Sequence, residues 1–437
     1  MGRTVADNRR VPPAFRYFEL VDDTTDRYEF WEIAVDGPTL ELRHGPVGTA
    51  GKHERETFAS EAIALSEHQL RIAAHLADGF REVADRRLDA RTRALEDAIA
   101  ADPDDATSFL VYADWIQTLG DARGSLIVAQ HAAESDPAAA KRAAAYLKHH
   151  EELFLGPLAK HLGFEGAYLE LTWHRGFIRR AIMYVDHHAE CARVFEALLD
   201  HPSARWLSEL TLQTFGPTTG MQAVVDVLAR HVCPHLRSLE IGEVGQRREA
   251  DLDDETNLDT WWARPGANLQ QLWPAVPALR RLVIRGEPQR IGVLALPQLE
   301  HLELHVRDLS PSDLHSIVRT TGPLERLELR FLWPLGGELA DDLRPLFESS
   351  LIRGLDHLAI AGERAWLTGV DGVCEAIARL PKLSLRSLDL SQGWMTDRGA
   401  EALANSRLEL DLIDVSRNQL TYQGKAMLER IAKLVIS

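Results

Sequence analysis

Three short segments in the second half of the chain carry arginine, histidine and glutamate at a spacing that could support binding chemistry. They are RLVIR, HLELH and RLELR, which begin at Arg281, His301 and Arg326. Alternate residues of an extended strand share one face, so the charged residues of each segment are expected to point to the same side. Arginine presents a planar fork of donors that fits carboxylates and phosphates. These residues therefore predict a surface that binds an acidic partner.

The elements that must position these residues are indicated by a recurring Leu-x-x-Leu-x-Leu pattern. Its eight copies begin at Leu207, Leu236, Leu279, Leu299, Leu324, Leu355, Leu385 and Leu410. The average step of about 29 residues is long enough for one strand and one helix per repeat. Neither element buries its apolar side alone, so stacked repeats must share a continuous core. The pattern predicts an α/β leucine-rich-repeat solenoid at residues 166–437, with parallel strands on the concave face and helices outside.

Stacking would align the outward residues of these strands in columns. The expected partner-binding residues in the columns are Arg281, Arg285, His301, Glu303, His305, Arg326, Glu328 and Arg330. The alternative is a solvated face whose charges neutralise one another between neighbouring columns. An insertion at 242–268 adds the adjacent tryptophans Trp261 and Trp262, which are also expected to contact a partner because exposed tryptophans often anchor interfaces. The alternative there is that one tryptophan packs back onto the repeats.

Residues 15–87 predict a small α+β domain, with alternating strands followed by a helix that begins near Ser60 and ends near Gly79. The order FWEI, DG, LELRHGPVGTAG and TFASEAIA resembles the WGR domain, which in poly(ADP-ribose) polymerases contacts DNA. The family's Trp-Gly-Arg motif falls on His44-Gly45-Pro46, where only the glycine matches. The resemblance implies Arg43, His44 and Lys52 as candidate nucleic-acid contacts. The alternative is a sheet with a structural or protein-binding role.

The remaining segments complete the predicted domain organisation. Residues 1–14 are expected to form a flexible arm, and residues 88–165 a helical module. The module contains a Pro-Asp-Asp turn followed by Tyr-Ala-Asp-Trp at residues 112–115, and it resembles a helical domain found beside bacterial repeat arrays. The block LWPAVPALRRLVIRG resembles an uncharacterised bacterial leucine-rich-repeat family. Neither resemblance implies an activity.

Composition narrows the function classes. The net charge is −17, and such an acidic excess repels phosphate backbones and anionic membrane surfaces. The three cysteines, Cys191, Cys233 and Cys374, lie far apart. They predict neither a disulfide framework nor a CxxC metal signature, which suits a reducing cytoplasm. No stretch reaches 18 uninterrupted apolar residues, so no transmembrane helix is expected.

Catalytic and metal-binding patterns are absent from the sequence. It contains no HExxH, GxSxG, Walker A or GxGxxG motif. The histidine pairs at 149–150 and 187–188 lack an acidic or cysteine partner at ligand spacing. We therefore expect a cytoplasmic, non-enzymatic scaffold that binds a partner protein without a metal or cofactor. The main alternative is an adaptor that associates with nucleic acid through its N-terminal domain. A third possible function is an enzyme with an unrecognised site.

Overall fold

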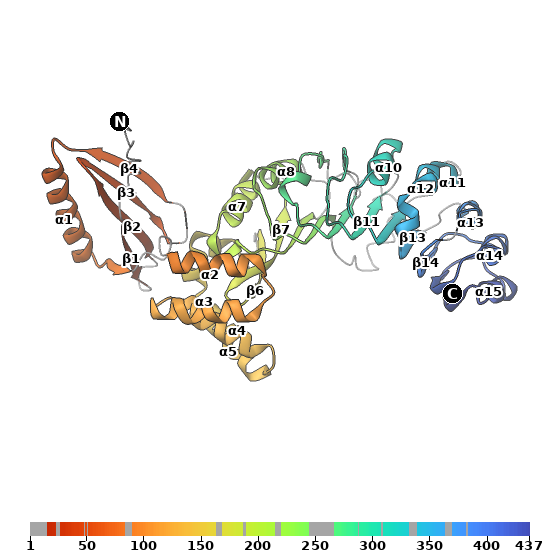
Figure 1. The fold of residues 1–437 in the computed structure, drawn as a ribbon, viewed down its shortest axis with the longest axis horizontal. Coiled ribbons are helices and arrows are strands. Elements are labelled where there is room, and N and C mark those ends of the chain that lie inside the picture. The colour runs from red at the N-terminus through yellow and green to blue at the C-terminus, as the bar shows by residue number, and fades with distance from the viewer. Residues whose placement is uncertain are drawn as a thin grey trace, which may run out of the picture. The chain divides into compact units, whose positions relative to one another are not determined.

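The fold is taken from a computed structural model (Figure 1). It describes residues 15–22, 27–47, 49, 51–83, 90–162, 168–186, 189–214, 220–243, 266–286, 288–306, 309–331, 339–362, 369–381 and 383–437. The expected arm at 1–14 and both tryptophans of the insertion, Trp261 and Trp262, lie outside these residues. The chain divides into two compact units. Unit 1 comprises Met1–Lys160, Trp173–Ile178 and Asp200–Trp206, and unit 2 comprises His161–Thr172, Arg179–Leu199 and Leu207–Ser437.

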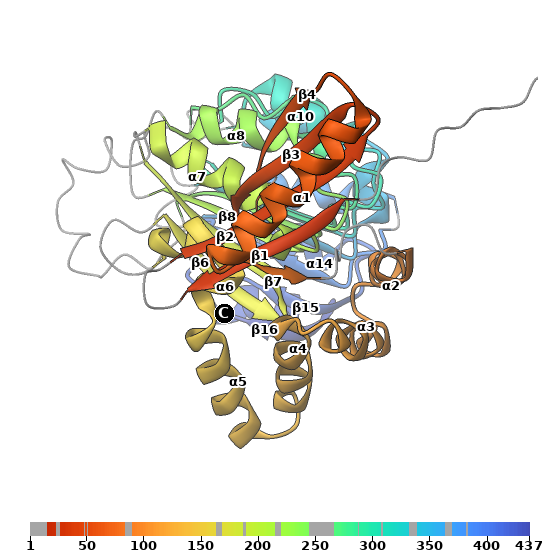
Figure 2. The same ribbon diagram turned by 90° about the vertical axis from the view of Figure 1, so that its left-hand side faces the viewer.

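Unit 1 begins with a five-stranded antiparallel sheet of order β4-β3-β2-β1-β5. Its elements are β1 (Arg16–Asp22), β2 (Arg27–Asp36), β3 (Thr39–Pro46), β4 (Lys52–Thr57), α1 (Glu61–Ala77) and β5 (Arg81–Val83). Ser60 caps α1 as predicted, because its hydroxyl accepts a hydrogen bond from the Ile63 amide. Helix α1 covers one face of the sheet (Figure 2). The apolar side chains between helix and sheet include Phe18, Trp31 and Ile72. The short strand β5 was not predicted from the sequence.

The rest of unit 1 is mainly helical, as expected. Its α-helices are α2 (Ala90–Ala101), α3 (Ala106–Thr118), α4 (Ala122–Ala133), α5 (Pro137–His149) and α6 (Glu151–Leu155). The turn predicted before α3 is confirmed, since the Asp105 carboxylate accepts hydrogen bonds from the Thr107 and Ser108 amides. The core of this part joins Phe109 and Tyr112 of α3 to Phe177 and Trp206, which lie far away in the sequence.

Unit 2 contains most of an eleven-stranded sheet whose strand order follows the sequence from β6 to β16. All the neighbouring pairs from β7 to β16 are parallel. The strands are β6 (Leu169–His174), β7 (Phe177–Val185), β8 (Glu209–Thr214), β9 (Ser238–Glu243), β10 (Arg281–Arg285), β11 (His301–Val306), β12 (Arg326–Phe331), β13 (His357–Gly362), β14 (Ser387–Asp389), β15 (Leu410–Asp414) and β16 (Ala432–Ile436).

The helices between these strands lie on one side of the sheet (Figure 1). They are α7 (Ala189–Leu199), α8 (Met221–Arg230), α10 (Pro311–Val318), α11 (Leu339–Asp342), α12 (Arg344–Glu348), α13 (Asp371–Ala378), α14 (Asp397–Ala404) and α15 (Tyr422–Leu428). Each of the longer ones buries an apolar face, such as Val224 and Leu228 of α8. None of the helices in the described ranges is both long and apolar enough to cross a membrane.

The register of the parallel strands places the leucines of the repeated pattern opposite one another. One residue from each of eight strands lies in a single row, namely Leu210, Leu239, Leu282, Leu302, Leu327, Leu358, Leu388 and Ile413. All eight side chains are buried. A slip of one residue would turn a whole strand's apolar residues to the other face, so burial fixes the register. Strand β16 continues the sheet beyond the last predicted copy.

The backbone after β15 is held by the side chain of Asn418. Its amide oxygen accepts hydrogen bonds from the Gly393 and Met395 amides at 3.0 and 2.8 Å. Its amide nitrogen donates to the carbonyls of Leu390 and Val415. On the helix side of the same repeats, the Asp371 and Asp397 carboxylates accept from the amides of Thr396 and Thr421. Asparagine and aspartate thus satisfy successive turns in different ways.

Candidate functional site

The candidate site is a set of charged side chains on the face of the unit 2 sheet opposite the leucine row. We call it the charged layer, and its members are Glu240, Arg281, Arg285, His301, Glu303, His305, Arg326, Glu328, Arg330, His357 and Asp389. Eight of these residues were predicted from the sequence as partner-binding positions. The strand register brings all eight together on the three adjacent strands β10, β11 and β12.

The arginines of β10 lie between glutamates of the strands on either side. Arg285 donates to Glu240 on β9 at 2.8 Å and to Glu303 on β11 at 3.1 Å. Arg281 donates to the second oxygen of Glu303 at 3.1 Å and lies 4.0 Å from Glu240. Two guanidinium groups on β10 therefore link the carboxylates of the strands on either side, β9 and β11.

The arginines of β12 are paired in a similar way. Arg330 donates to Glu328 on its own strand at 2.9 Å and to Asp389 on β14 at 3.1 Å. Arg326 makes a longer hydrogen bond of 3.4 Å to Glu328. All four predicted arginines are thus ion-paired within the layer, which is the neutralised arrangement that the sequence left open as the alternative.

Three histidines approach the same carboxylates. His305 Nε2 lies 2.5 Å from both the Glu303 carboxylate and the Arg285 guanidinium. His301 Nε2 lies 3.4 Å from Glu328 and 3.9 Å from Glu303. His357, which is not among the expected partner-binding residues, places Nε2 3.7 Å from Glu328. Its position opposite Arg326 in the register could have revealed it.

These contacts set the ionisation of the two central glutamates. Burial alone would raise the pKa of Glu303, but the hydrogen bond with His305 and the charge of Arg285 outweigh it and hold that pKa at about 2. Interaction with His301 lowers the pKa of Glu328 against the opposing effect of burial, and Arg330 lowers it further. Burial lowers the pKa of His357. Near neutral pH the layer therefore holds ionised carboxylates beside an uncharged imidazole.

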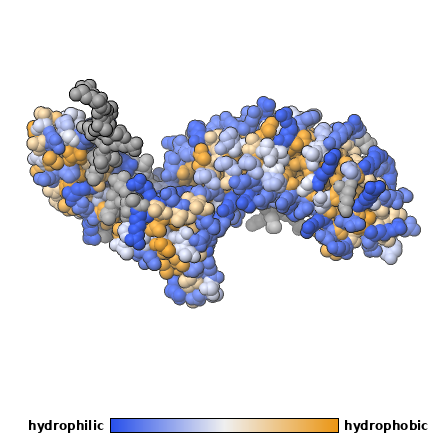
Figure 3. Space-filling view, in the orientation of Figure 1, coloured by the Kyte–Doolittle hydropathy of each residue, from blue (hydrophilic) through white to orange (hydrophobic). Residues whose placement is uncertain are grey.

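Exposure distinguishes the members that a partner could reach. The side chains of Arg281 and Arg326 are 38% and 47% exposed, whereas those of Glu303 and Glu328 are each 11% exposed. The face of the molecule drawn in Figure 3 is mostly hydrophilic, with scattered hydrophobic areas. Arg281 and Arg326 are therefore the cations of the layer best placed to contact another molecule.

The three residues implied by the WGR resemblance lie together on β3 and β4, and each is paired with a carboxylate. Arg43 makes two hydrogen bonds, of 2.8 and 3.0 Å, to the buried Glu32. The amine of Lys52 lies 2.6 Å from Glu54, and His44 Nε2 lies 3.6 Å from the same carboxylate oxygen. This part of the sheet therefore offers little unneutralised positive charge to a phosphate backbone.

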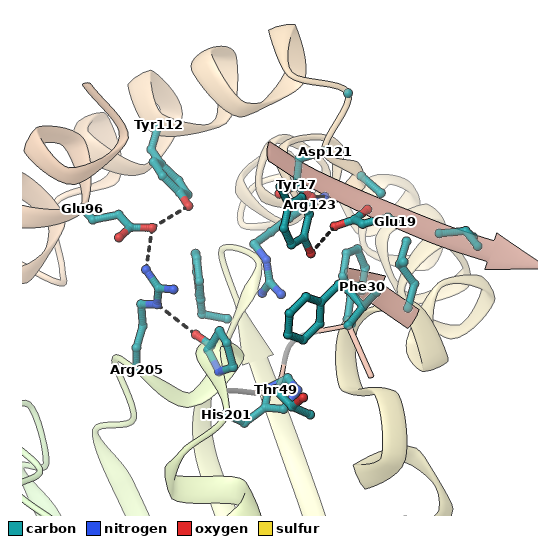
Figure 4. A pocket seen from close by; sticks show the side chains of 18 residues that line it. Tyr17, Glu19, Phe30, Thr49, Glu96, Tyr112, Asp121, Arg123, His201 and Arg205 are labelled. Atoms are coloured by element: carbon teal, nitrogen blue, oxygen red, sulfur yellow. Dashed lines mark hydrogen bonds and ion pairs between the residues drawn. The ribbon is translucent and has the colours of Figure 1, made fainter. Parts of the chain in front are cut away.

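Unit 1 also contains a pocket of about 380 Å³ that sequence reasoning missed (Figure 4). Its apolar walls include Phe30, Phe154 and Phe177. Its polar lining residues are Tyr17, Glu19, Thr49, Glu96, Tyr112, Asp121, Arg123, His201 and Arg205. These residues come from widely separated segments with no shared spacing, so no motif could have revealed the pocket.

A hydrogen-bonded group forms one side of this pocket. The Tyr112 hydroxyl donates to Glu96 at 3.0 Å, and Arg205 lies 2.5 Å from the same oxygen (Figure 4). Burial raises the pKa of Tyr112 and lowers that of His201 to about 4. The Nδ1 atom of His201 accepts a hydrogen bond from the Ser203 amide. The polar groups identified here are thus mainly engaged in holding their own segments together.

Comparisons with known proteins identify two segments of the chain. A family model of the WGR domain matches residues 14–87, and one of a leucine-rich repeat matches residues 382–404. No curated protein matches the sequence. Among solved structures, a Bacteroides fragilis protein is similar, with 18% identity over 97% of this chain and 96% of the other and a TM-score of 0.43, which is too low to carry an argument about fold or function. The chain therefore contains a WGR domain and a leucine-rich repeat.

Proposed function

We propose that this protein is a non-enzymatic cytoplasmic scaffold that binds a partner protein through the charged layer. In this proposal unit 2 is a leucine-rich-repeat solenoid and the layer lies on its concave face. The match at residues 382–404 and the continuous leucine row support the repeat assignment. Stacked repeats of this kind offer an extended surface rather than a closed active site.

The observation that carries the proposal is the difference in exposure within the layer. Ion pairs hold the buried carboxylates in place, while the guanidinium groups of Arg281 and Arg326 reach solvent. A partner carboxylate could accept hydrogen bonds from these two groups without first ordering them, which lowers the entropic cost of binding. The partner is therefore expected to present an acidic segment.

The ionisation of the layer also favours binding over catalysis. A general base works best when its pKa lies near the working pH. Glu303, with a pKa of about 2, is a poor proton acceptor at neutral pH. The same ion pairs that order the glutamates therefore make them unsuitable for acid–base chemistry.

The test is an affinity capture from the source cell with the double variant R281A/R326A, read by mass spectrometry. The matched control is R379A/R398A, because Arg379 and Arg398 are exposed, both pair with Glu375 and lie on the helix side. We expect the first variant to lose a partner that the wild type and the control both retain. Equal capture by all three proteins would refute the assignment of the layer.

A nucleic-acid-associated role is the second candidate, and the WGR match at residues 14–87 supports it. The test is a gel shift with short DNA and RNA ends at low salt, using K52A and the control K433A. Lys52 and Lys433 are both exposed lysines paired with one carboxylate. Binding that K52A weakens and K433A does not would favour this role, and the absence of any low-salt binding would exclude it.

A further inference from the structure

We propose that the charged layer contains a binding site for a zinc-class transition-metal ion. The ligands would be His301 on β11, Glu303 on the same strand and Glu328 on β12, with His357 of β13 as a fourth candidate. The nearest ligand atoms of the first three residues all lie within 4.8 Å of one another. This site is independent of whether the layer binds a partner protein.

The distances between ligand atoms resemble those around a tetrahedral ion. Nitrogen and oxygen ligands bound to zinc at about 2.0–2.1 Å lie roughly 3.3–3.4 Å apart. His301 Nε2 lies 3.4 Å from Glu328 Oε1 and 3.9 Å from Glu303 Oε2. His357 Nε2 lies 3.7 Å from the same oxygen of Glu328. Small side-chain movements would bring these atoms onto a common ion.

The histidine nitrogens provide a second, independent observation. His301 Nε2 and both ring nitrogens of His357 are buried, and none has a hydrogen-bond partner among the described residues. The His357 residue as a whole is only 9% exposed. A buried polar atom without a partner costs free energy. A metal ion bound through these nitrogens would remove that cost.

The arginines leave one oxygen of Glu328 largely available. Arg330 holds Glu328 Oε2 at 2.9 Å, while Oε1, which faces both histidines, receives only the 3.4 Å contact from Arg326. On Glu303, Arg285 and His305 engage Oε1, and Arg281 donates to Oε2 at 3.1 Å, a hydrogen bond that the metal ion would replace. Arginines that bind the far side of a carboxylate orient it toward a metal, as outer-shell partners do in known metal sites.

The donor atoms indicate which ion the site would take. Four arginines balance the carboxylates of Glu240, Glu303, Glu328 and Asp389, so net charge alone does not select one divalent ion over another. Imidazole nitrogens favour zinc, nickel and cobalt over the hard ions Mg²⁺ and Ca²⁺. The expectation of no metal rested on histidines adjacent in sequence. It could not detect ligands that strand register brings together from three strands.

The test uses the full chain freed of metal with a chelator. Zn²⁺ binding is measured by calorimetry, and Co²⁺ binding by the visible absorption that a tetrahedral nitrogen and oxygen site produces. We expect one ion per chain at this site and at least a tenfold weaker affinity in H301A and in E328Q. The control is H315A, since His315 is an exposed histidine on α10 whose Nδ1 lies 2.6 Å from the Pro311 carbonyl oxygen.

Two readouts on H301A separate the loss of a ligand from misfolding. His301 is partly exposed, so H301A should retain the wild-type far-ultraviolet dichroism and unfolding midpoint in the absence of metal. A second readout is the rise in unfolding midpoint on adding Zn²⁺, which should occur in wild type and H315A and disappear in H301A. Absence of stoichiometric binding, or equal binding by wild type, H301A and E328Q, would overturn the proposal.

Discussion

Arg330 on β12 donates a hydrogen bond of 3.1 Å to Asp389 on β14, and so reaches across the strand that lies between them. That strand, β13, contributes alanine at both intervening positions. Ala361 pairs with Arg330 in the register, and Ala359 pairs with Asp389. Both alanines are buried. Their small side chains leave room for the guanidinium group to span β13.

The first prediction concerns this bridge. Asp389→Asn removes the charge that Arg330 meets on β14, so the free energy of unfolding should fall by about 1–3 kcal/mol. Urea denaturation measures the change. The control is Asp411→Asn, which breaks the exposed pair with Lys433 and should cost much less. Equal effects of the two variants would show that the bridge across β13 adds no stability.

The second prediction concerns pH and unit 1. Burial lowers the pKa of His201 to about 4 in the folded protein, against an ordinary value of 6.5. Between these values the unfolded chain binds a proton that the folded protein does not, so stability is complete above pH 6.5 and falls as the pH drops toward 4. The loss should reach roughly 3 kcal/mol.

His201→Asn tests this assignment. The asparagine side-chain oxygen can still accept the hydrogen bond from the Ser203 amide that His201 Nδ1 now accepts, but it does not titrate. Urea midpoints measured from pH 8 to pH 4 should therefore change less in the variant than in the wild type. Curves of identical slope would mean that another group causes the loss.

The third prediction concerns acid stability in unit 2. The pKa of Glu303 is about 2 in the folded protein and 4.5 ordinarily. The carboxylate therefore contributes stability that is present above pH 4.5 and is lost as the pH falls toward 2. Hydrogen exchange of the β11 amides should speed up over this interval in wild type. The exchange rate should depend less on pH in Glu303→Gln. A wild-type exchange rate that does not change between pH 4.5 and 2 would contradict the assignment.

The fourth prediction concerns Asn418. Asn418→Ala leaves the Gly393 and Met395 amides without their acceptor, so the free energy of unfolding should fall by about 1–3 kcal/mol. Asn418→Asp keeps an acceptor but loses the donor to Leu390 and Val415, and should have an intermediate effect. Exchange rates of the two amides give a local readout. Unchanged protection in the alanine variant would contradict this role.

The fifth prediction concerns Gly242 in β9. Its φ is +119°, and an added Cβ would lie 1.8 Å from the Arg285 carbonyl oxygen. Gly242→Ala should therefore destabilise the protein by at least about 2 kcal/mol, since both the backbone and the neighbouring strand must shift. The control is Gly354→Ala, where a Cβ would meet nothing within 4 Å. Thermal unfolding of both variants measures the difference, and equal midpoints would argue against close packing at Gly242.

The strands and most helices could be predicted because their signal is local and repetitive. Rows such as Leu282, Leu302 and Leu327 repeat the same burial requirement, so the register followed from the pattern. The short strand β5 and the terminal strand β16 carry no such repeat and were missed. Pairing with a neighbouring strand defines them instead: β5, for example, is antiparallel to β1 at the edge of its sheet.

The residues of the charged layer on β10, β11 and β12 could be predicted. Their ion pairs with one another were only one of two alternatives, the other being arginines that are free to bind a partner. Parity alone places Arg285, Glu303 and His305 on one face. Whether a guanidinium points outward to a partner or sideways to Glu240 depends on side-chain rotamers and spacing between strands, which the sequence does not specify. The pocket beside Tyr112 and His201 depends on contacts between distant segments, and no residue spacing encodes those.

The pairing of β9 with β10 has a consequence for how this chain tolerates change in length. Arg281 pairs with Ser238 although it follows that residue by 43 positions, whereas His301 follows Arg281 by only 20 and occupies the equivalent place on the next strand. The hydrogen bonding between neighbouring strands thus does not depend on the length of the segment that connects them. Evolution can lengthen or trim these connections, and so vary what surrounds the sheet, while leaving the sheet itself as it was.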